Sequence, residues 1–461
     1  MLKAIINATV SKGRENEAEG CHIIMDGEKI REILPQSSKY PSDAEIIDAK
    51  GMLVLPGAID PHVHFNTPGF TEREDFETGT KSAAAGGVTT VIDMPDTSIP
   101  SVTDKKGLDA KLSVIEKMAV VDFALWGGVS GGAYRAGTWQ KAMRDVRTAG
   151  VVGFKCYLIS GMAEFTHLMP LDLIEVMRFA KEIGVLVGLH AEDRELVVSR
   201  QAQMQTAGRR DPLAYYEARK DPAEENGVRQ AMAIARETNA KIHIVHVASG
   251  GAAAAIAEAK KDGFDVTGET CAHYLEFNCD DFGRFGSILK TAPVVKTKKD
   301  NELLWEALKL GVLDFFASDH APCPKKDKET GSIWTDYGGI SGTELLLPYA
   351  FSEGYAKGKI SLARLAEVTS KNAAKRFGLY PRKGEIAAGS DADIVLIDPK
   401  KKWKVKGERF ESKGKLTPFE DKELTGKVVR TIVRGQTVYE EGKGIVAAAG
   451  TGQWIRVGTL F

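Results

Sequence analysis

The sequence carries no excess charge of either sign and has no long apolar run. Its 461 residues include 62 lysines and arginines against 63 aspartates and glutamates, so no global field favours nucleic acid or an anionic membrane. No stretch approaches the roughly 18 uninterrupted apolar residues that indicate a membrane span. We therefore expect no nucleic-acid and no membrane partner. A small neutral substrate fits this charge balance better than a polyanion.

Cysteine is scarce, and no secretory leader is visible. The five cysteines are scattered and odd in number, unlike the paired cysteines of a disulfide framework. The segment MLKAIINATV lacks a charged region followed by an apolar run and a small-residue cleavage site, which is the signal-peptide pattern. These two observations predict a cytoplasmic protein.

What the chain does have is a regular alternation of short apolar runs and longer helix-like segments. Most runs are too apolar for one-sided antiparallel strands and resemble parallel strands buried on both faces. The intervening LDLIEVMRFAKEIG keeps one apolar face, and Gly184 marks its end. Eight such units predict an α/β fold, a (β/α)₈ TIM barrel over residues 53–378, with a doubly wound sheet as the competing fold. The runs are residues 53–65, 88–95, 121–128, 151–157, 185–192, 241–249, 265–275 and 312–320.

The two ends of the chain have a different pattern. Residues 1–52 and 379–461 contain short strand-like segments separated by turn-forming residues. We expect both ends to pair into one small β-sandwich domain beside the barrel, with a tail in the second segment. The lysine-rich residues 399–407 fit a solvated loop or an edge strand better than a basic binding site.

The strongest local chemical signal is DPHVH, at the end of the first expected strand. Alternate residues of a strand point to the same face, so His62 and His64 can bind the same metal ion. Other metal-capable residues fall at the ends of other expected strands, where the active sites of such barrels lie. These residues are Lys155, His190, His246 and Asp319.

Lys155 is an unusual member of this set. An ammonium group has no lone pair and carries the wrong charge for a metal site. Carboxylation of its amine by carbon dioxide would turn it into an anionic oxygen ligand able to bridge two ions. A surface or salt-bridged lysine is the plain alternative, but GFKCY places Lys155 in an otherwise apolar strand.

Taken in order, the motifs resemble those of the cyclic amidohydrolases, which include allantoinases, hydantoinases, dihydropyrimidinases and dihydroorotases. They run from PGAIDPHVHF through GFKCY, LHAED, HIVHVAS, GETCAHYL and SDHAPCP to KGEIAAGSDADIVLID. The resemblance implies two divalent ions, zinc or alternatively manganese, cobalt or iron. It implies that Asp319 carries a proton from the attacking water to the leaving amide nitrogen, and that the chain forms a dimer or tetramer of identical subunits. The implied ligands are His62, His64 and Asp319 for one ion, His190 and His246 for the other, and carboxylated Lys155 between them.

Three positions argue against the dihydroorotase member of this group. Its pattern holds a substrate carboxylate with an arginine, an asparagine and a histidine, where this chain has Asn66, Asp96 and Cys323. If Asp96 faces the pocket, it would repel an anion. The stretches HVHFNTPG, GVVGFKC and SDHAPCP resemble allantoinases most, so we expect allantoin to be opened to allantoate, with Asn66 or Asp96 bonding its ureido group. Gly339, in YGGISG, is a candidate to offer backbone groups to the substrate, although an ordinary loop explains it as well.

Other functions stay open at this point. Hydantoinases and dihydropyrimidinases share several of the motifs and also take neutral rings. A related barrel could hydrolyse a linear dipeptide or an N-acyl amino acid. A non-enzymatic scaffold subunit is the alternative outside catalysis, and retention of all six ligand positions argues against it.

Overall fold

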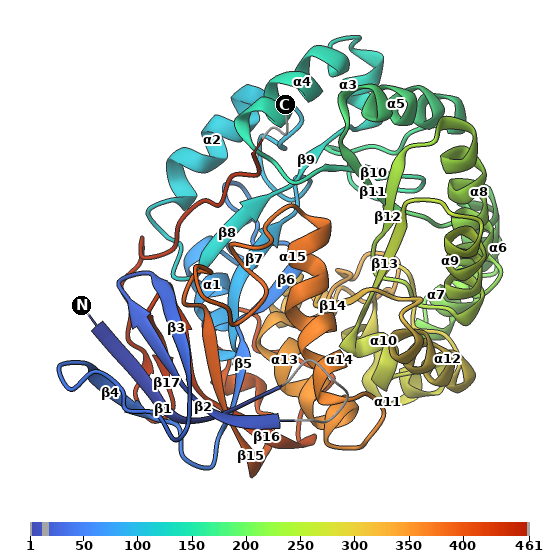
Figure 1. The fold of residues 1–461 in the computed structure, drawn as a ribbon. Helices are drawn as coiled ribbons and strands as arrows, with labels where there is room; N and C mark the ends of the chain where they lie inside the picture. Colours follow the sequence, from blue (N-terminus) through green and yellow to red (C-terminus); the bar gives the residue numbers. More distant parts are fainter. Residues whose placement is uncertain (1, 12–17, 459–461) are drawn as a thin grey trace.

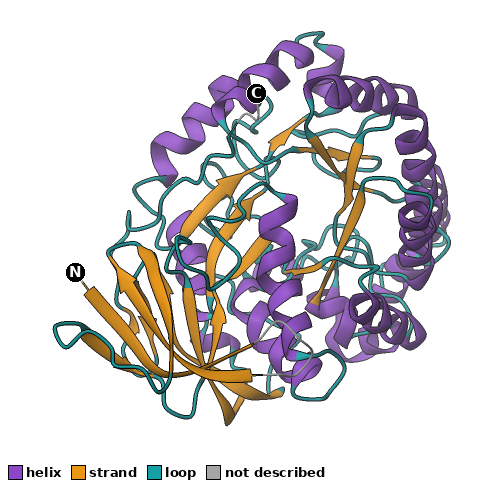
Figure 2. Cartoon of the chain, in the orientation of Figure 1, coloured by secondary structure: helices purple, strands orange, loops and turns teal. Residues whose placement is uncertain are grey.

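The computed structural model describes residues 2–11 and 18–458. A sheet built from the two ends of the chain lies beside a larger region of parallel strands (Figure 1). Helices cover the outer side of these parallel strands (Figure 2). The α/β class and the parallel strands expected from the apolar runs are therefore confirmed.

The terminal sheet has nine strands, and β5 joins its two halves. This strand pairs with β1 in parallel and with β15 in antiparallel orientation. The strand order is β18-β17-β16-β15-β5-β1-β2-β3, with β4 also paired to β1. The strands are β1 Leu2–Ser11, β2 Ala18–Asp26, β3 Lys29–Pro35, β4 Glu45–Asp48, β5 Leu53–Pro56, β15 Ile394–Lys404, β16 Glu423–Val433, β17 Gln436–Glu440 and β18 Gly444–Ile445.

The parallel strands form a three-stranded and a six-stranded sheet in chain order. The first contains β6 Ala58–Val63, β7 Val88–Asp93 and β8 Asp122–Leu125. The second contains β9 Gly127–Gly128, β10 Phe154–Tyr157, β11 Leu186–His190, β12 Lys241–Ile244, β13 Val266–Cys271 and β14 Phe315–Ala317. Backbone groups connect the two sheets on both sides: His64 N donates to His320 O over 2.9 Å, and Val152 N, just before β10, donates to Leu125 O of β8 over 3.0 Å.

Two of the expected runs each contain two strands. Residues 53–65 hold both β5 and β6, and residues 121–128 hold both β8 and β9. Strand β5 lies in the terminal sheet, just past the expected domain boundary at residue 52. The chain changes sheet at Gly57, where an added Cβ would lie 2.1 Å from the Thr89 hydroxyl oxygen. Only glycine fits where the chain passes from β5 to β6. The apolar content of residues 53–65 does not show that this run is divided between two sheets.

Helices separate most of the parallel strands and lie outside them (Figure 1). Helix α5 buries Leu173, Met177 and Ala180 and ends at Gly184, whose φ is 70°, as its sequence predicts. No helix in the described part of the chain is long and apolar enough to cross a membrane. The helices are α1 Phe76–Ala85, α2 Lys105–Ile115, α3 Gly131–Arg135, α4 Trp139–Ala149, α5 Pro170–Ile183, α6 Arg194–Thr206, α7 Pro212–Arg219, α8 Ala223–Thr238, α9 Gly250–Lys261, α10 Ala272–Glu276, α11 Phe282–Phe285, α12 Lys298–Leu310, α13 Leu346–Tyr349, α14 Leu362–Ala366 and α15 Asn372–Arg376.

A buried ion cluster ties the terminal sheet to the parallel strands. Lys383 Nζ lies 2.5 Å from Asp122 of β8, and 2.6 Å and 3.0 Å from Asp393 and Asp391, which precede β15. Arg434, which follows β16, also pairs with Asp122. Buried carboxylates need such partners because burial strongly disfavours an isolated charge.

Candidate metal centre

Three ligand-type side chains meet where β6 and β14 end. His62 is on β6, His64 follows it, and Asp319 lies two residues beyond β14. Asp319 Oδ1 is 3.3 Å from Nε2 of each histidine, and ligand atoms of the three residues lie within 4.8 Å of one another. Two imidazole nitrogens and a carboxylate oxygen at this spacing could hold one divalent ion.

A second histidine pair lies beside the first. His190 ends β11, and His246 lies two residues after β12. Their Nδ1 and Nε2 atoms are 3.0 Å apart, and the His62 and His246 ring centroids are 5.3 Å apart. The two groups therefore occupy one site at the carboxyl ends of the parallel strands.

Lys155, on β10, is a buried amine that lacks a hydrogen-bond partner among the described residues. Its side chain has no solvent exposure, and its Nζ is unpaired. Burial lowers its pKa, although Asp96 and Asp319 favour the charged form. A less basic amine reacts more readily as a neutral nucleophile, so this environment suits a lysine that is to be carboxylated. Lys155 Nζ has no hydrogen-bond partner among the described residues, so a carboxylated side chain at this position could form contacts that the amine lacks.

The electrostatics of the cluster favour a neutral imidazole at His62, His190 and His246, and a neutral ring has the lone pair that a metal requires. Burial, together with the charge of Lys155, holds the pKa of His62 well below its usual range. His246 is shifted in the same direction by burial and by His190. For His64 burial acts the same way, but the carboxylates of Asp96 and Asp319 outweigh it and raise its pKa. The donor set therefore fits a cation, which would bind the free imidazole lone pairs and be favoured by the carboxylates near His64.

Backbone strain accompanies the cluster. His246 and Asp319 have φ values of 41° and 47°, and Asn66, just after His64, has 54°. Residues with side chains occupy this left-handed region at an energetic cost of order 1 kcal/mol. Such strain is concentrated at functional sites, where the surrounding structure holds it in place.

Glu269 of β13 is a functional candidate that the sequence reading missed. Its Oε1 is 2.6 Å from His62 Nδ1 and accepts the backbone N–H of His246 over 3.2 Å, while Oε2 is 3.1 Å from His243 Nε2. Burial raises its pKa to about 8. A carboxylate behind a ligating histidine fixes the ring orientation and the tautomer. The available signal was an acid inside an apolar strand, in GETC.

Glu192 has the corresponding position behind the second pair. Its Oε2 is 2.8 Å from His190 Nε2 and also accepts from Arg219 Nη1 over 2.5 Å. Despite complete burial, Arg219 and His190 lower its pKa to about 2. Both histidine groups are thus backed by a buried carboxylate. The acid two residues after His190, in HAED, was the sequence signal.

A cavity of about 570 Å³ opens onto the cluster. His62, His64, His190, His246 and Asp319 all line it. Among the expected substrate residues, Asp96 and Gly339 line it, with Asp96 Oδ2 3.5 Å from His64 Nδ1. Asn66 and Cys323 are buried outside its lining. Its volume suits a small-molecule ligand.

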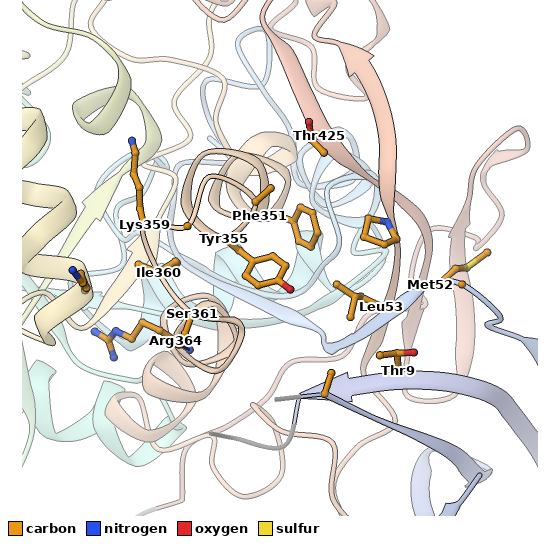
Figure 3. A pocket seen from close by; sticks show the side chains of 16 residues that line it. Thr9, Met52, Leu53, Phe351, Tyr355, Lys359, Ile360, Ser361, Arg364 and Thr425 are labelled. Atoms are coloured by element: carbon orange, nitrogen blue, oxygen red, sulfur yellow. Dashed lines mark hydrogen bonds between the residues drawn. The ribbon is translucent and has the colours of Figure 1, made fainter. Parts of the chain in front are cut away.

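A larger hollow of about 1030 Å³ lies elsewhere, between β5 of the terminal sheet and helix α14 (Figure 3). Leu53, Phe351, Tyr355 and Arg364 line it. Its lining, as far as the structure describes it, contains no histidine, cysteine, aspartate or glutamate. It therefore offers none of the usual side-chain ligands for a catalytic metal.

The chain is similar to known proteins over most of its length. The model of the family described as "Amidohydrolase family" matches residues 53–438. An allantoinase of Rubrobacter xylanophilus is 40% identical over 407 residues, 88% of each chain. An L-hydantoinase of Paenarthrobacter aurescens is 34% identical over 438 residues, 94% of this chain and 93% of the relative.

A solved structure gives the same result for the fold. The L-hydantoinase (dihydropyrimidinase) from Arthrobacter aurescens superposes with a TM-score of 0.94 at 32% sequence identity. The superposition covers 99% of this chain and 100% of the other. With a family model that spans most of its length and relatives above 30% identity, the chain belongs to the amidohydrolase family.

Proposed function

We propose that this protein is a metal-dependent hydrolase that opens the ring of a small neutral cyclic amide, and that its substrate is allantoin. The observation that carries the proposal is that ligand atoms of His62, His64 and Asp319 lie within 4.8 Å of one another and that all three residues line one cavity. The allantoinase relatives, which match most of the chain, support allantoin as the ring.

We propose that two divalent ions bind here, zinc or alternatively manganese, cobalt or iron. His62, His64 and Asp319 would hold one ion, and His190 and His246 the other. Lys155, carboxylated on Nζ, would reach both. When bound, such ions lower the pKa of water and polarise a carbonyl.

The remaining roles belong to the chain's own side chains. Asp319, whose Oδ1 already contacts both histidines, would take the proton of the attacking water and deliver it to the leaving nitrogen. Glu269 would hold His62 in one tautomer. Asp96, on the cavity wall, would accept from ureido N–H groups, and Gly339 would offer backbone groups. Asn66 and Cys323 would act only through residues that line the cavity.

We also propose the finer architecture. The two parallel sheets would close into a (β/α)₈ barrel over residues 53–378, since His64 and Val152 each donate a backbone hydrogen bond from one sheet to the other. Residues 1–52 and 379–461 would form the small β-sandwich domain and its tail. Self-association into a dimer or tetramer is testable by sedimentation.

Hydantoinase activity is the second candidate function. The L-hydantoinase relative and the high structural similarity to L-hydantoinase favour it. Both activities break the same kind of ring amide, so the metal centre alone does not separate them. The two activities differ in the ring substituent that the cavity must bind.

A substrate panel on metal-replete protein tests the proposal. Allantoin, hydantoins, dihydrouracil, dihydroorotate and a dipeptide are compared, with both enantiomers of each chiral ring. We expect allantoin to be opened fastest, with activity lost after chelation and restored by a divalent ion. The matched variant Asp319→Asn should abolish turnover.

Each contrary result has a defined meaning. Turnover of L-dihydroorotate alone would refute the substrate and keep the family chemistry. Absence of turnover on the whole panel, with no near-stoichiometric metal, would instead support a scaffold subunit.

A further inference from the structure

Arg219 is a buried cation on the cavity wall that the proposed metal centre does not use. It is the last residue of α7, it lines the cavity, and its side chain is only 13% exposed. One hydrogen bond, from Nη1 to Glu192, anchors it. Its Nε is buried and has no hydrogen-bond partner in the described part of the chain. A guanidinium has five N–H donors, so most of its donors remain available.

Lys290 places a second cation in the same cavity. Its Nζ donates to the carbonyls of Ile333 and Asp336 over 2.6 and 2.5 Å. Arg219 and Lys290 lie over the ring of Tyr215, at 5.1 and 5.0 Å from its centroid. Burial and the charge of Arg219 lower the pKa of Lys290 to about 8.

Few carboxylates are available to balance these cations. Glu192, the partner of Arg219, also contacts His190. The Asp336 carboxylate already accepts from Ser287 and from Thr330 N. Beyond the Arg219–Glu192 pair, this side of the cavity therefore offers N–H donors and the cation of Lys290, whereas Asp96 and Asp319 provide negative charge beside the histidines. Such a division suits a ligand with N–H groups at one end and an oxygen acceptor at the other.

We propose that Arg219 determines specificity by binding an oxygen acceptor on the ring substituent, away from the amide that is cleaved. In allantoin the acceptor is the carbonyl oxygen of the ureido group, and a carboxylate substituent presents the same chemistry. The inference rests on the proposed ring-opening function. It names the class of substituent that the cavity selects: one that carries a carbonyl or carboxylate oxygen.

The competing explanation is that Arg219 only orients Glu192 and, through it, His190. A residue acting through the metal ligands would affect every ring equally and would lower metal occupancy. A residue that binds the substituent would affect substituted rings far more than unsubstituted hydantoin. Arg219→Lys keeps a charge beside Glu192 and removes the fork of donors, so it separates the two roles.

The experiment compares Arg219→Met and Arg219→Lys with Arg194→Met, a control at a half-buried arginine outside the cavity lining whose ion pair, among the described residues, is with Glu195. For each variant, kcat/KM is measured for allantoin, unsubstituted hydantoin and hydantoin-5-acetate, together with bound metal. We expect Arg219→Met to lose roughly 10- to 100-fold more for allantoin than for hydantoin, the size of a charge-assisted hydrogen bond to a buried acceptor. The hydantoin-5-acetate measurement shows whether a carboxylate is preferred over a neutral carbonyl.

Calorimetric titration of allantoin into chelator-treated protein gives a readout that does not need turnover. Weaker binding to Arg219→Met than to the Arg194→Met control supports the inference. If the unmodified protein binds allantoin through Arg219 but opens no ring, the proposed function fails and this inference stands. Equal losses for allantoin and hydantoin, or unchanged allantoin binding in Arg219→Met, would overturn it.

Discussion

Replacing Lys383 by methionine should destabilise the whole fold, because this lysine neutralises carboxylates from two separate sheets. Its side chain is 1% exposed, and Asp122 and Asp393, both within 2.6 Å, are almost equally buried. Asp122 keeps Arg434 after the substitution, and Asp391 keeps Lys29 and Arg382. Asp393 loses its only side-chain cation among the described residues.

The expected loss of stability is therefore that of one buried carboxylate, Asp393, left without a cation. Removing a single partner of a buried pair costs about 3–5 kcal/mol of folding stability. The total loss should not exceed this range, because other cations of the cluster still pair with Asp122 and Asp391. Lys29→Met is the matched control, because Lys29 is 49% exposed and its pair with Asp391 is redundant; it should cost at most about 1 kcal/mol. Urea unfolding followed by circular dichroism measures both values.

A double variant checks the cause. Lys383→Met combined with Asp393→Asn removes the stranded charge and should recover at least half of the lost stability. A loss below about 1 kcal/mol for Lys383→Met, or no recovery in the double variant, would refute the reasoning. The cluster would then be a solvated group whose charges need no partner.

Three further predictions follow from named contacts. Glu269→Gln removes the carboxylate behind His62 and should weaken metal binding about 10- to 100-fold, measured by competition with a chromogenic chelator; unchanged affinity would contradict the role of Glu269. Gly339→Ala should lower kcat/KM while the protein still folds, because Gly339 has φ 143° and a Cβ would lie 2.2 Å from Ala321 O on the cavity wall; wild-type kinetics would argue against it. The pKa of Asp391 is lowered from 3.8 to about 2, so its contribution to stability is complete above pH 4 and disappears as the pH falls through 2. When the free energy of unfolding is measured from pH 6 to pH 3, it should fall less steeply with acid in Asp391→Asn than in the unmodified protein. Equal slopes in the two proteins would count against this role of Asp391.

The sequence predicted the elements that depend on short-range pattern. Gly184 ends α5 because a helix stop needs only local geometry. The alternation of His62 and His64 indicated a shared face because strand periodicity is local too. In contrast, the bond between His62 and Glu269 joins residues 207 positions apart, and no short pattern encodes such a pairing.

Residues of the cavity wall were harder to predict than the metal-ligand candidates. Arg219 ends a short helix in the segment DPLAYYEAR, whose local pattern does not show that its last residue reaches the cavity. Its place on the cavity wall is visible only in the packed structure. Asn66 and Cys323 occupy motif positions next to the ligand candidates, but neither belongs to the cavity lining. Nearness in sequence to a ligand does not fix which wall a side chain faces.

The junction at Gly57 has a consequence for protein engineering. A boundary between two structural units normally tolerates a linker or an inserted tag. Here His62 lies five positions after Gly57, on the strand that leaves the junction directly. Since neighbouring strand positions face opposite ways, a slip of one position after an insertion would turn His62 and His64 away from Asp319. Fusions at this point must therefore preserve strand register, even though the join lies outside the cavity.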